Sequence, residues 1–203
     1  MTKTRMEAFS DGVFAIVITL LILDIRLPEV NYANLPHALV ETLPRIAAYV
    51  MSFAVIGLYW VTHHRSCELI SKVDGAILWL NALLLLLVSF LPFPTSLLGR
   101  YPFQPIPIVM YGLTLLACNA VGFATLAYVW HRPHLHSAEY GGRRNIWRQV
   151  PVYAGTNAAY LLAVLLAWVA PLASYILLLL TMVVLIVRIV LYGPDQVRER
   201  HTA

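Results

Sequence analysis

The chain has 203 residues, of which 60% are hydrophobic and only 12% charged, with a formal net charge of +4 and a sequence pI of about 9.2. These charges are too few to cover a soluble globule of this length, so the composition excludes a soluble protein and predicts an all-α integral membrane protein. The basic residues lie in short stretches between apolar runs, as membrane orientation requires, which argues against a role in nucleic-acid binding.

A polar segment, residues 5–12, opens the first apolar run of the chain. Polar groups at the start of a membrane-spanning helix are costly, so this segment is a candidate functional site. Thr4 and Glu7 have the spacing of a capping box, which predicts that the first helix begins near Thr4 and already contains Ser10 and Asp11.

At 100° per residue the first helix carries an apolar stripe, and Asp11 points nearly the opposite way. The stripe consists of Phe9, Gly12, Ile16, Leu20 and Leu23, with Thr19 on its edge. A stripe of this kind is most often lipid-facing or part of a core. If several copies surround an axis, however, Ile16 and Leu23 form apolar rings, Thr19 forms a hydroxyl ring, and the carboxylates of Asp24 and Glu29 attract cations to the outer mouth.

Six apolar segments are long enough to cross a bilayer, and together they predict a six-helix bundle forming one domain over residues 1–203. The segments are residues 8–27, 44–64, 75–98, 106–130, 149–170 and 172–192. Only Val169, Ala170 and Pro171 separate the last two spans, which predicts a tight helical hairpin. The first three spans do not repeat in the last three, which disfavours a transporter built from inverted repeats.

The distribution of Lys and Arg predicts that both termini are cytoplasmic. In this orientation only Arg26, Arg45 and Arg100 lie outside. The other eleven lie inside: Lys3, Arg5, Arg65, Lys72, Arg132, Arg143, Arg144, Arg148, Arg188, Arg198 and Arg200. The long polar loop at residues 131–148 fits either contact with anionic lipid headgroups or an orientation signal alone.

Asp11 needs a partner if it is buried, because an unpaired carboxylate in a low dielectric costs several kcal/mol or takes up a proton. Trp60, His63 and His64 end the second span at the same depth and are candidate partners. The histidines fit equally well as interfacial polar residues. A metal site is disfavoured, because neighbouring residues on a helix point about 100° apart.

Together these residues resemble the transmembrane protein 175 family, the endolysosomal potassium channels of animals and their bacterial homologues. The pattern that carries the resemblance consists of Arg5, Phe9, Ser10, Asp11, Ile16, Thr19, Asn81 and the segment Phe90–Thr95. It covers the first three spans, whereas the last three are similar only in hydropathy.

The resemblance implies a potassium-permeable, moderately potassium-selective channel in the bacterial inner membrane, with K⁺ as the permeant ion and no cofactor. The first helix would line the pore and narrow it at Ile16, with Thr19 in or next to the filter and either Leu20 or Leu23 completing the constriction. Arg5, Phe9, Ser10 and Asp11 would tie this helix to its neighbours. With one six-helix unit per chain, the resemblance implies a homotetramer.

No Thr-Val-Gly-Tyr-Gly filter occurs in the sequence, so selectivity would arise from ion dehydration at an apolar neck. A proton-coupled transporter, with Asp11, His63 and His64 as a relay, is the alternative function. An enzyme is disfavoured, because no nucleophile elbow, phosphate loop or zinc-protease motif is present.

Overall fold

The structure is a computed structural model that describes residues 2–26, 28–137 and 142–191, without the side chains of 142–146. The helices in these ranges are α1 (Lys3–Leu20), η1 (Leu21–Asp24), η2 (Tyr32–Asn34), α2 (Leu35–Glu68), α3 (Gly75–Phe90), α4 (Pro92–Arg100), α5 (Pro105–Trp130), η3 (Pro133–Leu135), α6 (Gly142–Leu166) and α7 (Pro171–Leu191). Six segments are long and apolar enough to cross a membrane, which confirms the predicted number of spans. Arg198 and Arg200 lie outside the described residues.

The first helix begins at Lys3, next to the predicted start near Thr4, and contains Ser10 and Asp11, but the predicted capping box is wrong. Thr2, not Thr4, is the N-cap: its backbone is extended, and its hydroxyl accepts a hydrogen bond from the Arg5 N–H at 3.4 Å. Thr4 lies inside α1, so the Thr4 and Glu7 pair does not form a capping box. The competing cap two residues earlier takes the terminal N–H groups.

Three other boundaries differ from the prediction, and prolines account for two of them. α2 begins at Leu35 with Pro36 in its first turn and continues through Pro44, so it extends well beyond the predicted 44–64. The predicted span 75–98 breaks at Leu91, where Pro92 starts α4. α6 begins at Gly142 rather than at 149.

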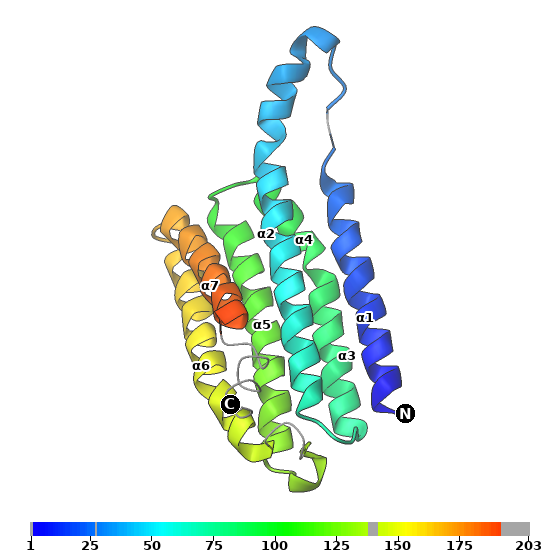
Figure 1. Cartoon of the computed structure of the whole chain (residues 1–203). Coiled ribbons are helices and arrows are strands. Elements are labelled where there is room, and N and C mark those ends of the chain that lie inside the picture. The colour runs from blue at the N-terminus through cyan, green and yellow to red at the C-terminus, as the bar shows by residue number, and fades with distance from the viewer. Residues whose placement is uncertain (1, 27, 138–141, 192–203) are drawn as a thin grey trace.

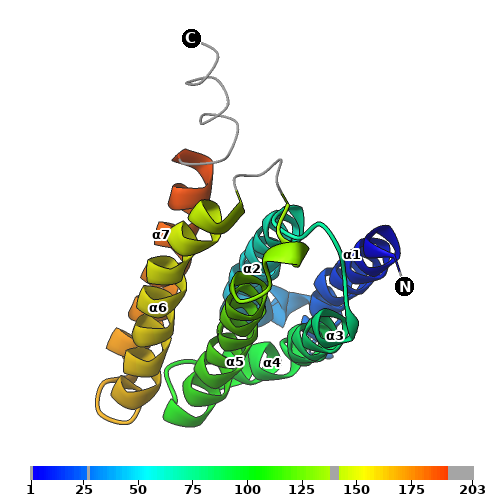
Figure 2. The same ribbon diagram turned by 90° about the horizontal axis from the view of Figure 1, so that it is seen from below.

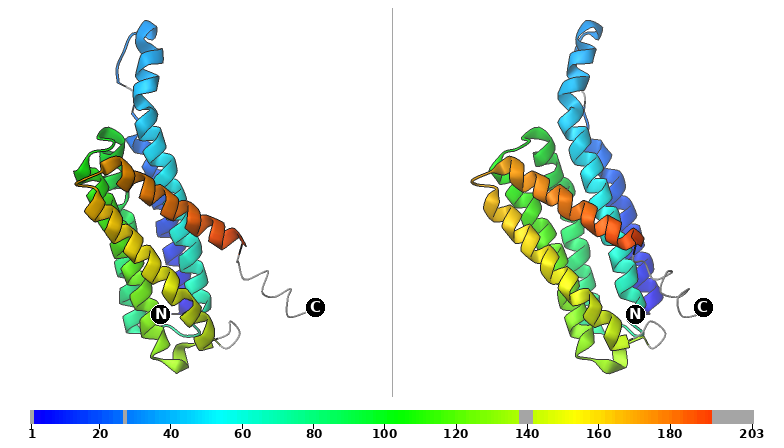
Figure 3. Two further views of the ribbon diagram at one scale, coloured as in Figure 1. Left: turned by 90° about the vertical axis from the view of Figure 1, so that its left-hand side faces the viewer. Right: turned by 60° about the vertical axis from the view of Figure 1, so that its left-hand side comes forward.

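The helices form an elongated bundle with α1 at one side and the α6–α7 hairpin at the other (Figures 1 and 2). α1 packs against α2 and α3, while α5 packs against α3 and α6. The N-terminal part of α2 projects beyond the other helices (Figure 1). α6 and α7 are joined by a tight turn, as predicted, but α7 crosses the bundle obliquely instead of following α6 (Figure 3).

A chain of buried hydroxyl groups joins α2, α4 and α5 in the bundle core. Thr95 donates to the Leu91 carbonyl at 2.8 Å, so its oxygen accepts from Ser52 at 2.8 Å. Ser52 in turn accepts from the Tyr111 hydroxyl at 3.1 Å. The chain ends on a carbonyl at the α3–α4 break, which fixes this break against two other helices.

Candidate functional site

The two faces of α1 have opposite environments. Its buried face consists of Met6, Ser10, Phe14, Val17 and, in η1, Leu21. The predicted stripe is on the open side: Phe9 is 60% exposed, Ile16 60%, Leu20 46% and Leu23 63%. Because α1 lies at the edge of the bundle (Figure 2), these side chains are not used in packing within the chain.

The last turn of this segment keeps Leu20 and Leu23 together. α1 ends at Leu20 and continues as the 3₁₀-helix η1, in which residues three apart lie over one another. Leu23 therefore lies about 6 Å above Leu20 on the same side, at ~2.0 Å of rise per residue. Both residues thus stay on the stripe.

Two small residues on the exposed side of α1 do not contribute to packing within the chain. A Cβ atom at Gly12 would meet nothing within 4 Å. The Thr19 hydroxyl donates to the carbonyl of Ile16 at 2.8 Å, so its proton is satisfied while its oxygen lone pairs remain open. The exposed face is therefore smooth and apolar, with one hydroxyl oxygen beside Ile16.

Asp11 contacts α2 through Trp60. The indole Nε1–H of Trp60 donates to the Asp11 carboxylate at 2.8 Å, which brings together two residues that the sequence placed at one depth. Both side chains are exposed in the single chain, so Asp11 is not the buried carboxylate considered from the sequence. Among the described residues, no hydrogen bond joins Asp11 to His63 or His64.

A second contact ties α1 to α2 and α3 through buried amide and hydroxyl groups. Asn81 donates from Nδ2 to the Ser10 hydroxyl at 3.0 Å, and Ser10 donates to the Met6 carbonyl at 2.9 Å. The Asn81 Oδ1 lies 2.7 Å from Nε2 of His63 and accepts from that nitrogen. Three helices therefore meet at one polar cluster, which we call the Ser10–Asn81–His63 cluster.

The other candidate residues at this end of α1 and α2 lie outside this cluster. His64 is exposed and lies 3.8 Å from Glu68, one turn along the same helix. Arg5 and Phe9 are both exposed in the single chain. In the part of the chain that the structure describes, no three His, Cys, Asp or Glu side chains gather as a metal site would require.

At the opposite end of α1, Asp24 is already paired. Its carboxylate accepts from Ser96 at 2.8 Å and from Arg100 at 3.3 Å, and it forms a salt bridge with Arg100. Much of its charge is therefore compensated, which weakens the predicted attraction of cations. Glu29 lies exposed in the segment between η1 and η2.

Comparison with known proteins shows which family the chain is similar to. The family described as "Endosomal/lysosomal potassium channel TMEM175" matches residues 5–92, a segment that runs from α1 to the start of α4. The crystal structure of a lysosomal potassium-selective channel TMEM175 homolog from Chamaesiphon minutus is 32% identical, with a TM-score of 0.81 over 92% of this chain and 97% of that chain. The chain belongs to the TMEM175 family.

Named relatives of the TMEM175 family match about two thirds of the chain. A potassium channel of Streptomyces collinus is 44% identical over 132 residues, covering 63% of each chain. The human endosomal/lysosomal proton channel TMEM175 is 30% identical over 137 residues, covering 66% of this chain and 27% of the human protein. The matched region thus spans just under two thirds of the bacterial relative and about a quarter of the human one.

The sequence did not predict which side chains join α1 to α3, or α2 to α3, in this member of the TMEM175 family. Asn81 entered the sequence argument only as part of the resemblance, although it is an amide inside an apolar run and such residues usually bond to another helix. Arg100 was placed on the outer side like Asp24, but the pairing between them was not predicted. The two cysteines, Cys67 and Cys118, are free and buried.

Proposed function

We propose that this chain forms a potassium-permeable, moderately potassium-selective cation channel whose pore is lined by α1. The observation that carries the proposal is the exposed apolar face of α1, where Ile16 and Leu23 are each at least 60% exposed although they belong to a membrane-spanning helix. In an assembly in which several copies of α1 surround a central axis, these side chains would form a narrow apolar neck. A potassium ion gives up its hydration water more readily than sodium, so such a neck favours potassium.

The names of bacterial relatives support the choice of ion. Bacterial relatives from Streptomyces collinus and Chamaesiphon minutus are named potassium channels. Since a single α1 cannot enclose an ion path, four copies of the chain would surround the pore. Gly12 and Ala15 would allow close approach of neighbouring subunits near the axis.

The orientation belongs to the same proposal. Eleven Lys and Arg residues on one side against three on the other favour cytoplasmic termini in a bacterial inner membrane. In this orientation the Ser10–Asn81–His63 cluster lies near the cytoplasmic end of the pore, and the Asp24–Arg100 pair lies near the outer end.

The transporter alternative receives less support from the contacts. Asp11 is engaged by Trp60, and His63 by Asn81, so these groups do not form a continuous relay within the described residues. His64 is turned towards Glu68.

The experiment that tests the proposal is reconstitution of the purified protein in liposomes with an outward potassium gradient. We expect a membrane potential negative inside, as an electrogenic potassium leak would create, and a smaller one with an equal sodium gradient. Protein-free liposomes with and without a potassium ionophore set the two limits. Saturable flux with a fixed proton stoichiometry would instead support the transporter, and no potassium-dependent potential would refute the channel.

A further inference from the structure

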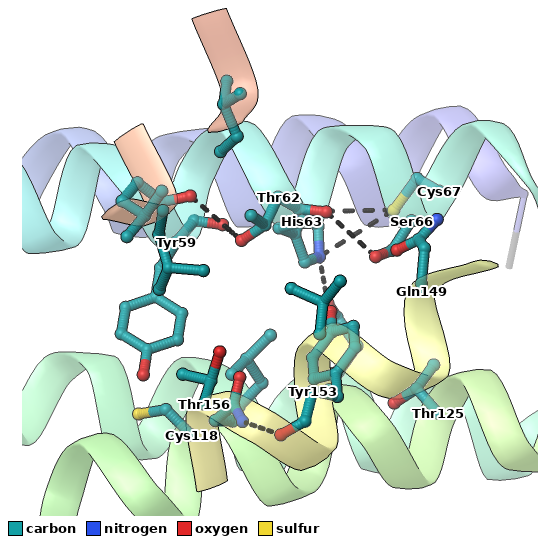
Figure 4. A pocket seen from close by; sticks show the side chains of 18 of the residues that line it. Tyr59, Thr62, His63, Ser66, Cys67, Cys118, Thr125, Gln149, Tyr153 and Thr156 are labelled. Atoms are coloured by element: carbon teal, nitrogen blue, oxygen red, sulfur yellow. Dashed lines mark hydrogen bonds between the residues drawn. The ribbon is translucent and has the colours of Figure 1, made fainter. Parts of the chain in front are cut away.

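A cavity of about 110 Å³ lies inside the single chain, apart from the exposed face of α1. Residues of α2, α5, α6 and α7 form most of its walls (Figure 4). The oblique course of α7 separates its C-terminal end from α6 (Figure 3), and this divergence leaves the space between them incompletely filled.

The cavity wall combines apolar surface, neutral polar groups and one fixed positive charge. Aliphatic side chains such as Leu58, Ile77 and Leu185 alternate with hydroxyl and amide side chains such as Thr125 and Asn119. Among the described residues, Arg188 is the only Lys or Arg side chain in the lining, and no Asp or Glu contributes to it.

A second positive charge lies at the same mouth. The guanidinium of Arg65 donates from Nη2 to the carbonyl of Ile189 at 3.4 Å, and Ile189 itself lines the cavity beside Arg188. The charges of Arg65 and Arg188 repel each other. Among the described residues, neither forms a salt bridge with a carboxylate, although an ionised group in a membrane-spanning segment normally has such a partner.

We propose that this cavity binds a small single-chain amphiphile with an anionic head group, the head at Arg188 and Arg65 and the apolar part between α2, α5 and α6. The two arginines without acidic partners select an anion and reject a cation. The apolar walls select a hydrocarbon chain over an inorganic anion, which would lose its hydration there. The volume restricts the apolar part, since an apolar cavity of about 150 Å³ holds a molecule of the size of benzene.

The position of His63 connects this cavity to α1. His63 lines the cavity, and its Nε2 is held by Asn81, which in turn bonds Ser10 of α1. A bound molecule that displaces the His63 ring therefore alters a contact of the pore-lining helix. This regulatory part rests on the proposed channel function, whereas the binding part does not.

Both cysteines of the chain line the cavity, which supplies a direct measurement of binding. In phosphatidylcholine proteoliposomes, alkylation of Cys67 and Cys118 by N-ethylmaleimide is followed by mass spectrometry with hexanoate, hexanol or hexylammonium present. We expect hexanoate to slow alkylation at least threefold and hexylammonium to leave it unchanged. Arg188→Gln should abolish the protection, while Arg132→Gln, an arginine outside the cavity lining, should retain it.

A second variant covers the case in which Arg188→Gln folds poorly. Thr156→Leu fills part of the cavity from its wall and should also abolish protection by hexanoate. Equal protection by all three probes, no protection, or protection that survives both variants would overturn the proposed site. Protection by phosphatidylglycerol in the bilayer but not by hexanoate would assign the site to a two-chain lipid and overturn it as well.

Potassium flux is recorded in the same proteoliposomes to separate regulation from binding. A change of flux with hexanoate in the parent protein, absent in Arg188→Gln, supports the link through His63. Protection without any change of flux overturns that link and leaves the site standing. An absence of potassium flux under all conditions refutes the channel proposal alone, because the thiol readout does not depend on it.

Discussion

At the scale of single residues, α1 separates side chains that hold the helix from side chains that face out of the chain. Ser10 and Asp11 follow one another in sequence but contact different helices, α3 and α2. Ile16 does not hold α1 to another helix in the way that Ser10 and Asp11 do, since 60% of its surface is exposed. Substitutions in the two groups should therefore affect different properties.

Ile16→Asn is expected to reduce discrimination between potassium and sodium. The amide would hydrate the apolar neck, so both ions would pass with less dehydration. Bi-ionic reversal potentials of reconstituted protein measure the change, with Ile176→Asn on the exposed face of α7 as the matched control. An unchanged reversal potential for Ile16→Asn would remove Ile16 from the filter.

Asp11→Ala is expected to lower stability by about 1–2 kcal/mol and to leave selectivity nearly normal, because a hydrogen bond to a charged group is lost. The cost should stay below that of a buried ion pair, since Asp11 is exposed. Trp60→Phe removes the same bond from the other side, so the double variant should be less damaging than the sum of the two single changes. Normal stability with altered ion preference would place Asp11 in the pore.

At the scale of helices, caps and breaks determine where each element starts. Asp74 is the N-cap of α3: its Oδ1 accepts from the Ile77 N–H at 3.0 Å, and its Oδ2 accepts from the Tyr128 hydroxyl at 2.7 Å. The Ile77 N–H and the Tyr128 hydroxyl hold the pKa of this carboxyl below its usual value. Asp74 therefore joins the start of α3 to α5.

Asp74→Ala is expected to destabilise the protein by about 1 kcal/mol, the usual cost of losing an N-cap, whereas Asp74→Asn should retain the cap. Because the folded pKa is lowered, the stabilisation by Asp74 is present above the unfolded pKa and is lost as the pH falls through the folded value. Thermal unfolding between pH 7 and acid conditions measures this loss. A parent protein and an Asn variant with the same pH dependence would contradict this role of Asp74.

Thr95→Val is expected to be more destabilising than Tyr111→Phe. The valine leaves the Ser52 hydroxyl without an acceptor in the core, at a cost of about 1–3 kcal/mol, whereas the phenylalanine removes only the first donor of the chain. Thr95→Ser keeps the hydroxyl and serves as the control. Equal losses for Thr95→Val and Tyr111→Phe in thermal unfolding would contradict the hydroxyl order derived from the Leu91 carbonyl.

At the scale of the whole molecule, α1 is accessible because it lies at the edge of the bundle (Figure 2). The opposite side, formed by α6 and α7, also exposes apolar side chains such as Leu165 and Val184. Contact with lipid explains the exposed apolar side chains of α6 and α7. The α1 face differs because it carries the hydroxyl oxygen of Thr19 beside its apolar side chains.

We expect a homotetramer, and Gly12→Leu should reduce its yield. A side chain at Gly12 meets nothing within the chain, so the subunit should fold, but it would separate neighbouring copies near the axis. Gly155→Leu on α6, also in open space, is the matched control. Native mass spectrometry in mild detergent gives the result, and a conducting monomer would refute the tetramer.

The sequence by itself determined the six spans, the hairpin at Pro171 and the apolar stripe on α1, because each depends on local hydropathy or on helical periodicity. Only the tertiary structure decided that Ser10 meets Asn81, that Arg100 pairs with Asp24, and that the oblique α7 leaves a cavity beside Arg188. Apolar periodicity groups the residues of one helix face, but it does not decide whether that face is buried, since the apolar stripe of α1 is exposed. It does not specify which helix covers that face or at what angle, and these contacts join residues from 71 to 76 positions apart.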